Sequence, residues 1–310
     1  RMLQGVDLDS HPVYIWIMKG RQPMPNKHLE HPEDLILTGE TWVVDAMFGQ
    51  ANCSLKIDGA PAIVWGTLDG KFFVGTKSVF NKKLIKIAYT QEDIDTFYSK
   101  HENVRLILSA CLQYLPRVDG IYQGDFIGFG GTDTYKPNTL TYKFPEVISQ
   151  DIIIAPHTEY QVPGKMCDAE ASPISVTFDD TDHVKFVQPI VDRMPLQGGI
   201  SLGKFPTLTD KEAAAAKVAI NARIREGNYL THNFLCGVLG DSDLAAVYLL
   251  VKHLKEEVLE SFIIYNAPKC YLGDELVDGE GFVLNTDMGS FKVVDRAQFS
   301  YANFTQGQFQ

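Results

Sequence analysis

Lys56 is the residue in this sequence best suited to covalent chemistry. It opens the run KIDG at 56–59, which ends a predicted strand and is followed by Ala-Pro and a second strand. A lysine amine becomes a nucleophile only when it loses its proton, and desolvation near other cations or a metal ion lowers its pKa. A strand end would hold the amine rigidly. Taken alone, however, this short run more often forms a β-turn with an exposed lysine.

Four more charged residues follow in short motifs along the chain. They are Lys77 in GTKS, Asp125 in YQGDF, Glu280 in EGFVL and Lys292 in SFKVV. Lys77 could belong to a solvated cluster with three nearby lysines, and Lys292 could lie at a strand edge. Asp125 and Glu280 could simply occupy turns. The whole set in this order is nevertheless much rarer by chance than any one member.

With these motifs in this order, the chain resembles the covalent nucleotidyltransferases, the superfamily of ATP-dependent DNA and RNA ligases and mRNA capping enzymes. The sequence HLEHPEDLIL before the lysine, with KIDGAPAIVWG, GKFFVGTKSVFNKK and YQGDFIGF, is similar to a ligase-related family encoded by tailed bacteriophages. The resemblance extends over residues 28–296.

The resemblance implies that Lys56 attacks the α-phosphate of ATP, expels pyrophosphate and holds AMP as a phosphoramidate. AMP then passes to a polynucleotide 5′-phosphate. Phosphoryl transfer requires positioning, metal ions and cations that stabilise the developing charge. By the same resemblance, Glu280 and Asp125 bind Mg²⁺ or Mn²⁺, and Lys292 acts with Lys56 in catalysis by gripping the α-phosphate. Lys77 matches a basic residue near the nucleotide or the bound strand.

The adenine ring is expected to stack on an aromatic side chain, and Tyr142 or Phe144 in TLTYKFP is placed for this role. A position in the strand core is the favoured alternative for both. Backbone groups near Ser54 and Leu55 are expected to read the base edge, and only the resemblance favours ATP over GTP. The expected nucleotide-binding set is Ser54, Leu55, Lys56, Asp58, Gly59, Lys77, Asp125, Tyr142, Phe144, Glu280 and Lys292.

The chain also departs from the family pattern. Ser290 and Val294 flank Lys292 where a second lysine is usual, and Asn285 stands where many relatives have lysine. The chain after the last motif is too short for the five-stranded OB-fold that DNA ligases and capping enzymes generally append, so no C-terminal OB-fold is expected. This favours an RNA-ligase-like enzyme that acts on nucleic acid with a 5′-phosphate end, RNA ahead of DNA.

Two other functions remain open. The same chemistry could deliver the nucleotide to a different acceptor, such as a protein or an RNA cap end. Alternatively, the absence of lysines that the family pattern usually has, together with the acidic net charge, could indicate a catalytically inactive binding module.

Hydrophobic patterning predicts the elements that would position these residues. Residues 41–80 are expected to form strands of a twisted antiparallel sheet, with a hairpin turn at Asp69-Gly70. A helix is predicted over 92–115, and short strands over IYQGDFIGF, TLTYKF and DIIIAP. A capping box at Thr209 opens an Ala-rich helix, a second helix covers 242–262, and the strands GFVLNT and SFKVVDR follow.

These patterns predict an α+β fold of twisted antiparallel sheets with flanking helices and a helical insertion. The resemblance implies that this fold is a nucleotidyltransferase domain, like that of ATP-grasp-like ligases. The predicted parts are an N-terminal extension (1–40), the first part of the core (41–202), the helical insertion (203–265) and the final strands and tail (266–310).

Composition limits the function classes. The chain has 310 residues, of which 45% are hydrophobic and 22% charged, as in ordinary globular proteins. Its net charge of -11 argues against a broadly positive nucleic-acid-binding surface but allows a local basic groove. Neither a secretory signal nor a membrane-spanning run is apparent. The five cysteines contain no CxxC pair and favour a location in a reducing cytoplasm. If the protein is phage-encoded, this is the cytoplasm of the host. The histidines and acids at 28–34 lack metal-ligand spacing and favour a polar helix start or a lid.

Overall fold

The computed structural model describes residues 28–299, so part of the expected N-terminal extension, with the stretch searched for a secretory signal, lies outside the described residues. The fold is α+β, as the sequence predicts, with mainly antiparallel sheets and several helices. No helix in the described range is long and apolar enough to cross a membrane.

The largest sheet has six strands in the order β3-β2-β4-β7-β8, with β9 paired in parallel to β7. Its strands are β2 (Ala62–Leu68), β3 (Lys71–Gly75), β4 (Ile121–Phe129), β7 (Ile152–Gln161), β8 (Glu170–Pro173) and β9 (Val184–Phe186). The expected hairpin turn is confirmed, because Asp69 (φ 51°) and Gly70 (φ 75°) both adopt the left-handed conformation that a tight turn between β2 and β3 requires.

Two helices cover one face of this sheet, α3 (Gln91–Phe97) and α4 (Glu102–Tyr114). They bury a core that includes Trp65 and Phe126. The prediction of one helix over 92–115 is wrong at its centre, where residues 98–101 interrupt it. Apolar spacing alone did not show this break, because Ile94 and Leu108 both face the same core.

The second half of the molecule is built on the sheet β1-β14-β15, made of β1 (Asn52–Leu55), β14 (Phe282–Thr286) and β15 (Gly289–Val293). The sequence strands GFVLNT and SFKVVDR are thus confirmed. Beside this sheet lie two further small ones. One has four strands: β5 (Thr134–Tyr135), β6 (Leu140–Lys143), β12 (Lys269–Leu272) and β13 (Glu275–Val277). The other pairs β10 (Ile190–Arg193) with β11 (Phe262–Tyr265).

The segment TWVVDAMF is a helix and not the predicted strand. It forms α2 (Trp42–Phe48), whose buried Val43, Val44 and Met47 pack with α7 and the face of β14-β15. A continuous apolar run has neither a clear period of two nor one of 3.6, so periodicity cannot decide between strand and helix. The predicted continuous sheet over 41–80 is also wrong, because β1 pairs with β14 and not with β2.

The helical region contains α5 (Asp210–Arg225), α6 (His232–Leu239) and α7 (Ser242–Leu259). The capping box is confirmed, since Thr209 and Glu212 exchange hydrogen bonds at the start of α5. The second predicted helix ends at Leu259, and the chain continues into β11. These helices pack with α1 (Pro32–Leu35), η1 (Ile36–Thr38) and α2, so the described part of the N-terminal segment joins the helical layer.

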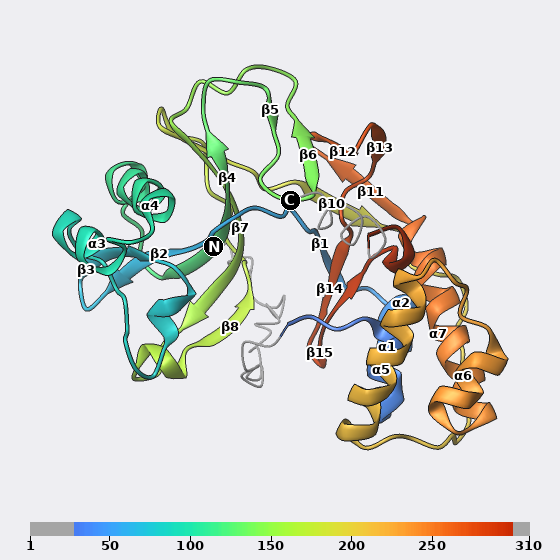
Figure 1. Cartoon of the computed structure of the whole chain (residues 1–310). Coiled ribbons are helices and arrows are strands. Elements are labelled where there is room, and N and C mark those ends of the chain that lie inside the picture. Colours follow the sequence, from blue (N-terminus) through green and yellow to red (C-terminus); the bar gives the residue numbers. More distant parts are fainter. Residues whose placement is uncertain (1–27, 300–310) are drawn as a thin grey trace, which may run out of the picture.

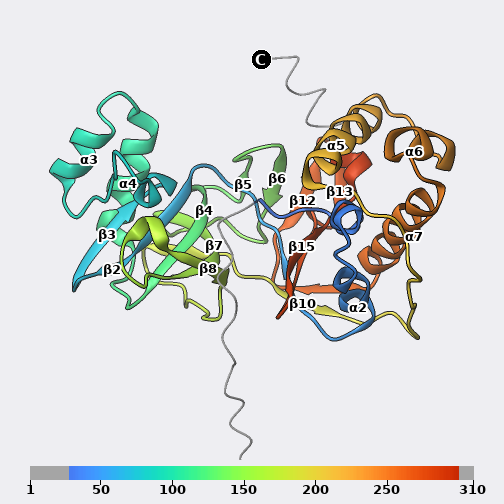
Figure 2. The same ribbon diagram turned by 90° about the horizontal axis from the view of Figure 1, so that it is seen from below.

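Figures 1 and 2 show the two halves side by side, with the six-stranded sheet and α3-α4 in one and the β1-β14-β15 sheet with α5-α7 in the other. Residues 56–61 connect β1 to β2 and therefore pass from one half to the other (Figure 1). The candidate nucleophile Lys56 begins this crossing segment.

Candidate functional site

Lys56 lies between two carboxylates at the end of β1. Its Nζ is 2.5 Å from Asp58 Oδ1 and 2.5 Å from Glu280 Oε2. The strand pairing explains this meeting: Leu55 pairs with Phe282, and the Lys56 N–H donates to the Gly281 carbonyl at 2.9 Å. The antiparallel register thus brings together residues 224 positions apart.

Lys292 reaches the same region from β15. Val283 pairs with both Lys292 and Ser54, and residues directly opposite one another in an antiparallel sheet share a face. That face is turned away from the helices, because the alternate residues Phe282 and Phe291 pack toward them. Lys292 and Ser54 therefore lie on the open face that leads to Lys56.

The charges of Lys292 and Lys56 also act on one another. Burial lowers the pKa of Lys292, and the like charge of Lys56 lowers it further. The backbone of Lys292 is fixed separately, because its N–H donates to the Glu30 carbonyl at 3.0 Å. The two lysines that the sequence assigns to catalysis thus share one site.

Asp125 on β4 holds the segment after Lys56. Its Oδ2 accepts the Gly59 N–H at 3.0 Å, and its Oδ1 lies 3.4 Å from His157 Nε2. The Asn138 amide donates to the Gly59 carbonyl at 3.1 Å. Glycine is needed at position 59, because a Cβ there would lie 2.2 Å from the Phe126 carbonyl oxygen.

Tyr142 and Phe144 are core residues, which confirms the favoured alternative to base stacking. Tyr142 is 1% exposed, and its hydroxyl accepts the Asp58 N–H at 2.9 Å. Phe144 is buried against Tyr135. Neither ring offers an open face for a base, so Tyr142 instead supports the loop that carries Asp58. Leu55 likewise points into the core.

The charges around Lys56 act on its pKa in the direction opposite to the sequence expectation. Burial alone would lower the pKa of Lys56, but Glu280 and Asp58 outweigh it and raise the pKa. Burial and the neighbouring Asp58 raise the pKa of Glu280 to about 7. Burial would also raise the pKa of Asp58, but hydrogen bonding to Glu280 and the charge of Lys56 lower it. The amine is therefore held as an ammonium ion in this arrangement.

Two carboxylates at the site offer oxygen ligands of the kind that a divalent cation takes. The described residues contain no group of three or more His, Cys, Asp or Glu side chains placed to hold a metal ion. Mg²⁺, however, is commonly bound by one or two carboxylates with water and phosphate oxygens completing its shell. The Asp58 and Glu280 carboxylates, which flank one ammonium, supply such oxygens, whereas the recorded partners of Asp125 are Gly59 and His157.

Lys77 is exposed at the start of η2 (Lys77–Phe80), just after β3. Within residues 28–299 its side chain has no recorded hydrogen bond or ion pair. It is not part of the Lys56 ion-pair cluster.

A buried ionic network behind β15 was missed by sequence reasoning. Glu33 Oε1 accepts from Lys255 Nζ at 2.5 Å, and Asp34 Oδ2 accepts from Arg296 Nη2 at 2.9 Å. The Tyr248 hydroxyl joins this network through Asp34 at 3.3 Å. One sequence signal was available, because Lys255 continues the apolar stripe of α7 where a solvated lysine would be out of place.

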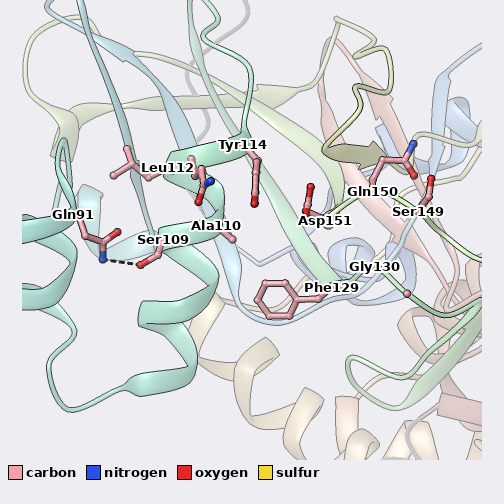
Figure 3. Close-up of a pocket in the computed structure, with 12 residues that line it drawn as sticks. Gln91, Ser109, Ala110, Leu112, Tyr114, Phe129, Gly130, Ser149, Gln150 and Asp151 are labelled. Carbon is pink, nitrogen blue, oxygen red and sulfur yellow. Dashed lines mark hydrogen bonds between the residues drawn. The ribbon is translucent and has the colours of Figure 1, made fainter.

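A pocket of about 700 Å³ lies elsewhere, between α4 and the ends of β4 and β7 (Figure 3). Tyr114 and Phe129 contribute rings to it, and Gln91 donates to Ser109 at 2.8 Å on its wall. Its lining contains no lysine or arginine and none of the predicted site residues. The pocket is therefore separate from the Lys56 site.

The described fold and site define an α+β protein whose two halves together hold a lysine between two carboxylates. The chain belongs to a family of unknown function (DUF6267), whose model matches residues 26–222 and 208–308. Neither the curated proteins nor the solved structures give a match.

Proposed function

We propose that this protein is an ATP-dependent polynucleotide ligase of RNA-ligase-like type that acts through a covalent lysyl-AMP intermediate on Lys56. One observation carries the proposal: Lys56, Glu280 and Lys292, which come from three separate sequence motifs, converge on one site. An ion pair that only stabilised the fold would need Glu280 as the partner of Lys56, but no second lysine. A second cation beside the nucleophile suits a site that receives phosphates.

In the proposed first step, Lys56 Nζ attacks the α-phosphorus of ATP. A P–N bond forms, the P–O bond to the β-phosphate breaks, pyrophosphate leaves and the amine gives up a proton. Lys292 would stabilise the charge that develops on the α-phosphate oxygens. This proton leaves through the contact with Glu280, whose Oε2 lies 2.5 Å from Lys56 Nζ.

Asp58 and Glu280 are the residues that would hold Mg²⁺ or Mn²⁺ together with the nucleotide. When bound, the metal ion would neutralise phosphate charge and so favour displacement at the α-phosphorus. Tyr142 and Asp125 would act as positioning residues, because their hydrogen bonds fix the backbone of Asp58 and Gly59.

In the second step, an oxygen of a nucleic-acid 5′-phosphate would attack the phosphorus of AMP. The P–N bond breaks, and Lys56 returns as an amine. A 3′-hydroxyl then attacks the activated 5′-phosphate, and AMP leaves. RNA is the preferred acceptor, on the resemblance described above.

Intact-protein mass spectrometry after incubation with ATP and Mg²⁺ tests the first step. The wild-type protein should gain the mass of AMP, whereas Lys56→Ala and Lys56→Arg should not. Lys56→Arg keeps a cation between Asp58 and Glu280, so its failure would not reflect a loss of folding. Lys204→Ala, a change at an exposed lysine near α5, is the matched control and should form the adduct.

An adduct on either Lys56 variant would overturn the assignment of the nucleophile. No adduct in the wild type with ATP or GTP, and with Mg²⁺ or Mn²⁺, would favour the inactive binding module. Incubation with labelled 5′-phosphorylated RNA and DNA would then identify the acceptor. An adduct that is never transferred to either strand would favour a protein or an RNA cap end.

A further inference from the structure

Residues 77–86, KSVFNKKLIK, form a basic segment that we call the lysine loop. It carries four lysines and no acidic residue in a chain of net charge -11. Lys77, Lys82 and Lys83 are exposed, and no hydrogen bond or ion pair with another described residue is recorded for their side chains. An unpaired lysine cluster of this kind attracts anions.

The lysine loop is anchored at both ends. Val79 is fully buried, and the Lys86 N–H donates to the Ser78 carbonyl at 3.4 Å. The fourth lysine is an anchor, because Lys86 Nζ donates to the Phe97 carbonyl at 3.2 Å and lies 5.1 Å from the centre of the Tyr98 ring. The exposed side chains of Lys82 and Lys83 are thus carried by a loop whose two ends are held in place.

Strand register places the lysine loop at the end of the large sheet that leads to the Lys56 site. Gly75, the last residue of β3, pairs with Val64 near the start of β2. The segment 56–61 enters β2 at that same end. The loop therefore begins where the candidate nucleophile segment joins the sheet.

Leu84, which follows Lys82 and Lys83 in the loop, adds a second observation. Its side chain is 83% exposed, and its backbone φ is 54°, a conformation that disfavours residues other than glycine, Asn and Asp. Neither feature stabilises the fold, and Ile85 beside it is also exposed. A strained, exposed apolar residue next to two free lysines is typical of a surface that makes contacts with a ligand.

We infer that the lysine loop binds the sugar–phosphate backbone of the single-stranded nucleic acid that the enzyme joins. Lys82 and Lys83 would each neutralise a phosphate, and Leu84 would contact an unstacked base or sugar. This inference rests on the proposed function for the identity of the strand. The charge, exposure and anchoring of the loop support the binding surface itself.

Salt-dependent binding of a fluorescent, 5′-phosphorylated single-stranded RNA, followed by anisotropy, tests the inference. For single strands, the slope of log K against log salt becomes shallower by about 0.7 for each phosphate that the protein no longer neutralises. The variant Lys82→Gln/Lys83→Gln should therefore have a slope shallower by about 1.4, and the wild-type advantage in affinity should shrink about sevenfold between about 50 and 200 mM salt.

The matched control is Lys204→Gln/Lys211→Gln, which removes the same charge from exposed lysines beside and within α5. Its slope should equal that of the wild type. An equal change of slope in both double variants, or no change at 82 and 83, would overturn the inference.

Adduct formation with ATP, measured in the same proteins, separates this inference from the proposed function. The variant Lys82→Gln/Lys83→Gln should form the Lys56 adduct at the wild-type rate, because the strand is absent from that step. The wild type could bind the strand through Lys82 and Lys83 and yet form no adduct. That result would refute the proposed function but support the nucleic-acid-binding surface.

Discussion

Lys255→Met is expected to destabilise the protein strongly, because it leaves a buried carboxylate without its main partner. Lys255 Nζ and Glu33 Oε1 are 2.5 Å apart, and their side chains are only 3% and 1% exposed. Arg296 Nη1 lies 3.5 Å from Glu33, but Arg296 already pairs with Asp34 at 2.9 Å. Removing one partner of a buried ion pair costs about 3–5 kcal/mol.

The double variant Glu33→Gln/Lys255→Met should recover most of that loss. It leaves Asp34 paired with Arg296, so the buried charges balance again. The pH dependence should also change. Burial would raise the pKa of Glu33, but the charge and hydrogen bond of Lys255, together with His31 and Arg296, outweigh burial and lower the pKa to about 2.

The sign of this pH effect follows from linkage. In the wild type, the Glu33 ion pair stabilises the fold above the unfolded pKa near 4.5, and this contribution is lost as the pH falls toward 2. In Lys255→Met, burial without the cation raises the pKa of Glu33 above its unfolded value. The deficit of the variant should therefore be largest at pH 7 and smaller near pH 4 to 5.

Urea denaturation followed by circular dichroism at 25 °C measures these free energies of unfolding. Lys252→Met is the matched control, because Lys252 pairs with Glu256 on the exposed side of the same helix. Its effect should stay within about 0.5 kcal/mol. A loss below about 1 kcal/mol for Lys255→Met, or a double variant that loses as much as the two single variants together, would refute the reasoning.

Three further changes test other parts of the structure. Burial above all lowers the pKa of His31 from 6.5 to about 2. As the pH falls, the unfolded chain therefore protonates this imidazole before the folded chain does, and the free energy of unfolding decreases. His31→Gln should remove about 2–3 kcal/mol of the decrease that urea titrations show between pH 6.5 and 4.5. Gly59→Ala would place a Cβ 2.2 Å from the Phe126 carbonyl oxygen. It should lower the free energy of unfolding by about 1–3 kcal/mol and abolish the AMP adduct. Gly164→Ala is the control and should do neither, because its Cβ would meet no atom within 4 Å. Leu84→Gly should raise the free energy of unfolding by up to about 1 kcal/mol while weakening RNA binding, and a loss of stability would contradict the strain at φ 54°.

Local signals predicted the elements whose geometry depends on a few residues. The Asp69-Gly70 turn needs two left-handed residues, and the Thr209 capping box needs only a side chain three positions away. The strand over 121–129 is also as the sequence indicates. In contrast, α2 became a helix because its apolar run packs against α7, a contact that no local pattern contains.

The same limit applies to the candidate site. Motif order gave the residue types that meet at Lys56, because each motif lies in a strand or next to one. It did not give the partners that fix their positions, such as the Tyr142 hydroxyl beneath Asp58. It also gave the wrong direction for the pKa of Lys56, since the approach of Glu280 depends on the pairing of β1 with β14.

That pairing makes assembly of the site depend on folding of both halves of the molecule. Asp125, which holds Gly59 after the nucleophile, belongs to the six-stranded sheet, whereas Glu280 and Lys292 arrive only when β14 and β15 join β1. The backbone of Lys292 is in turn tied to Glu30, three residues before the buried Glu33. The ionic network therefore contributes to the site without touching it: it fixes the N-terminal segment against β15, and so holds the second cation at a set place beside Lys56.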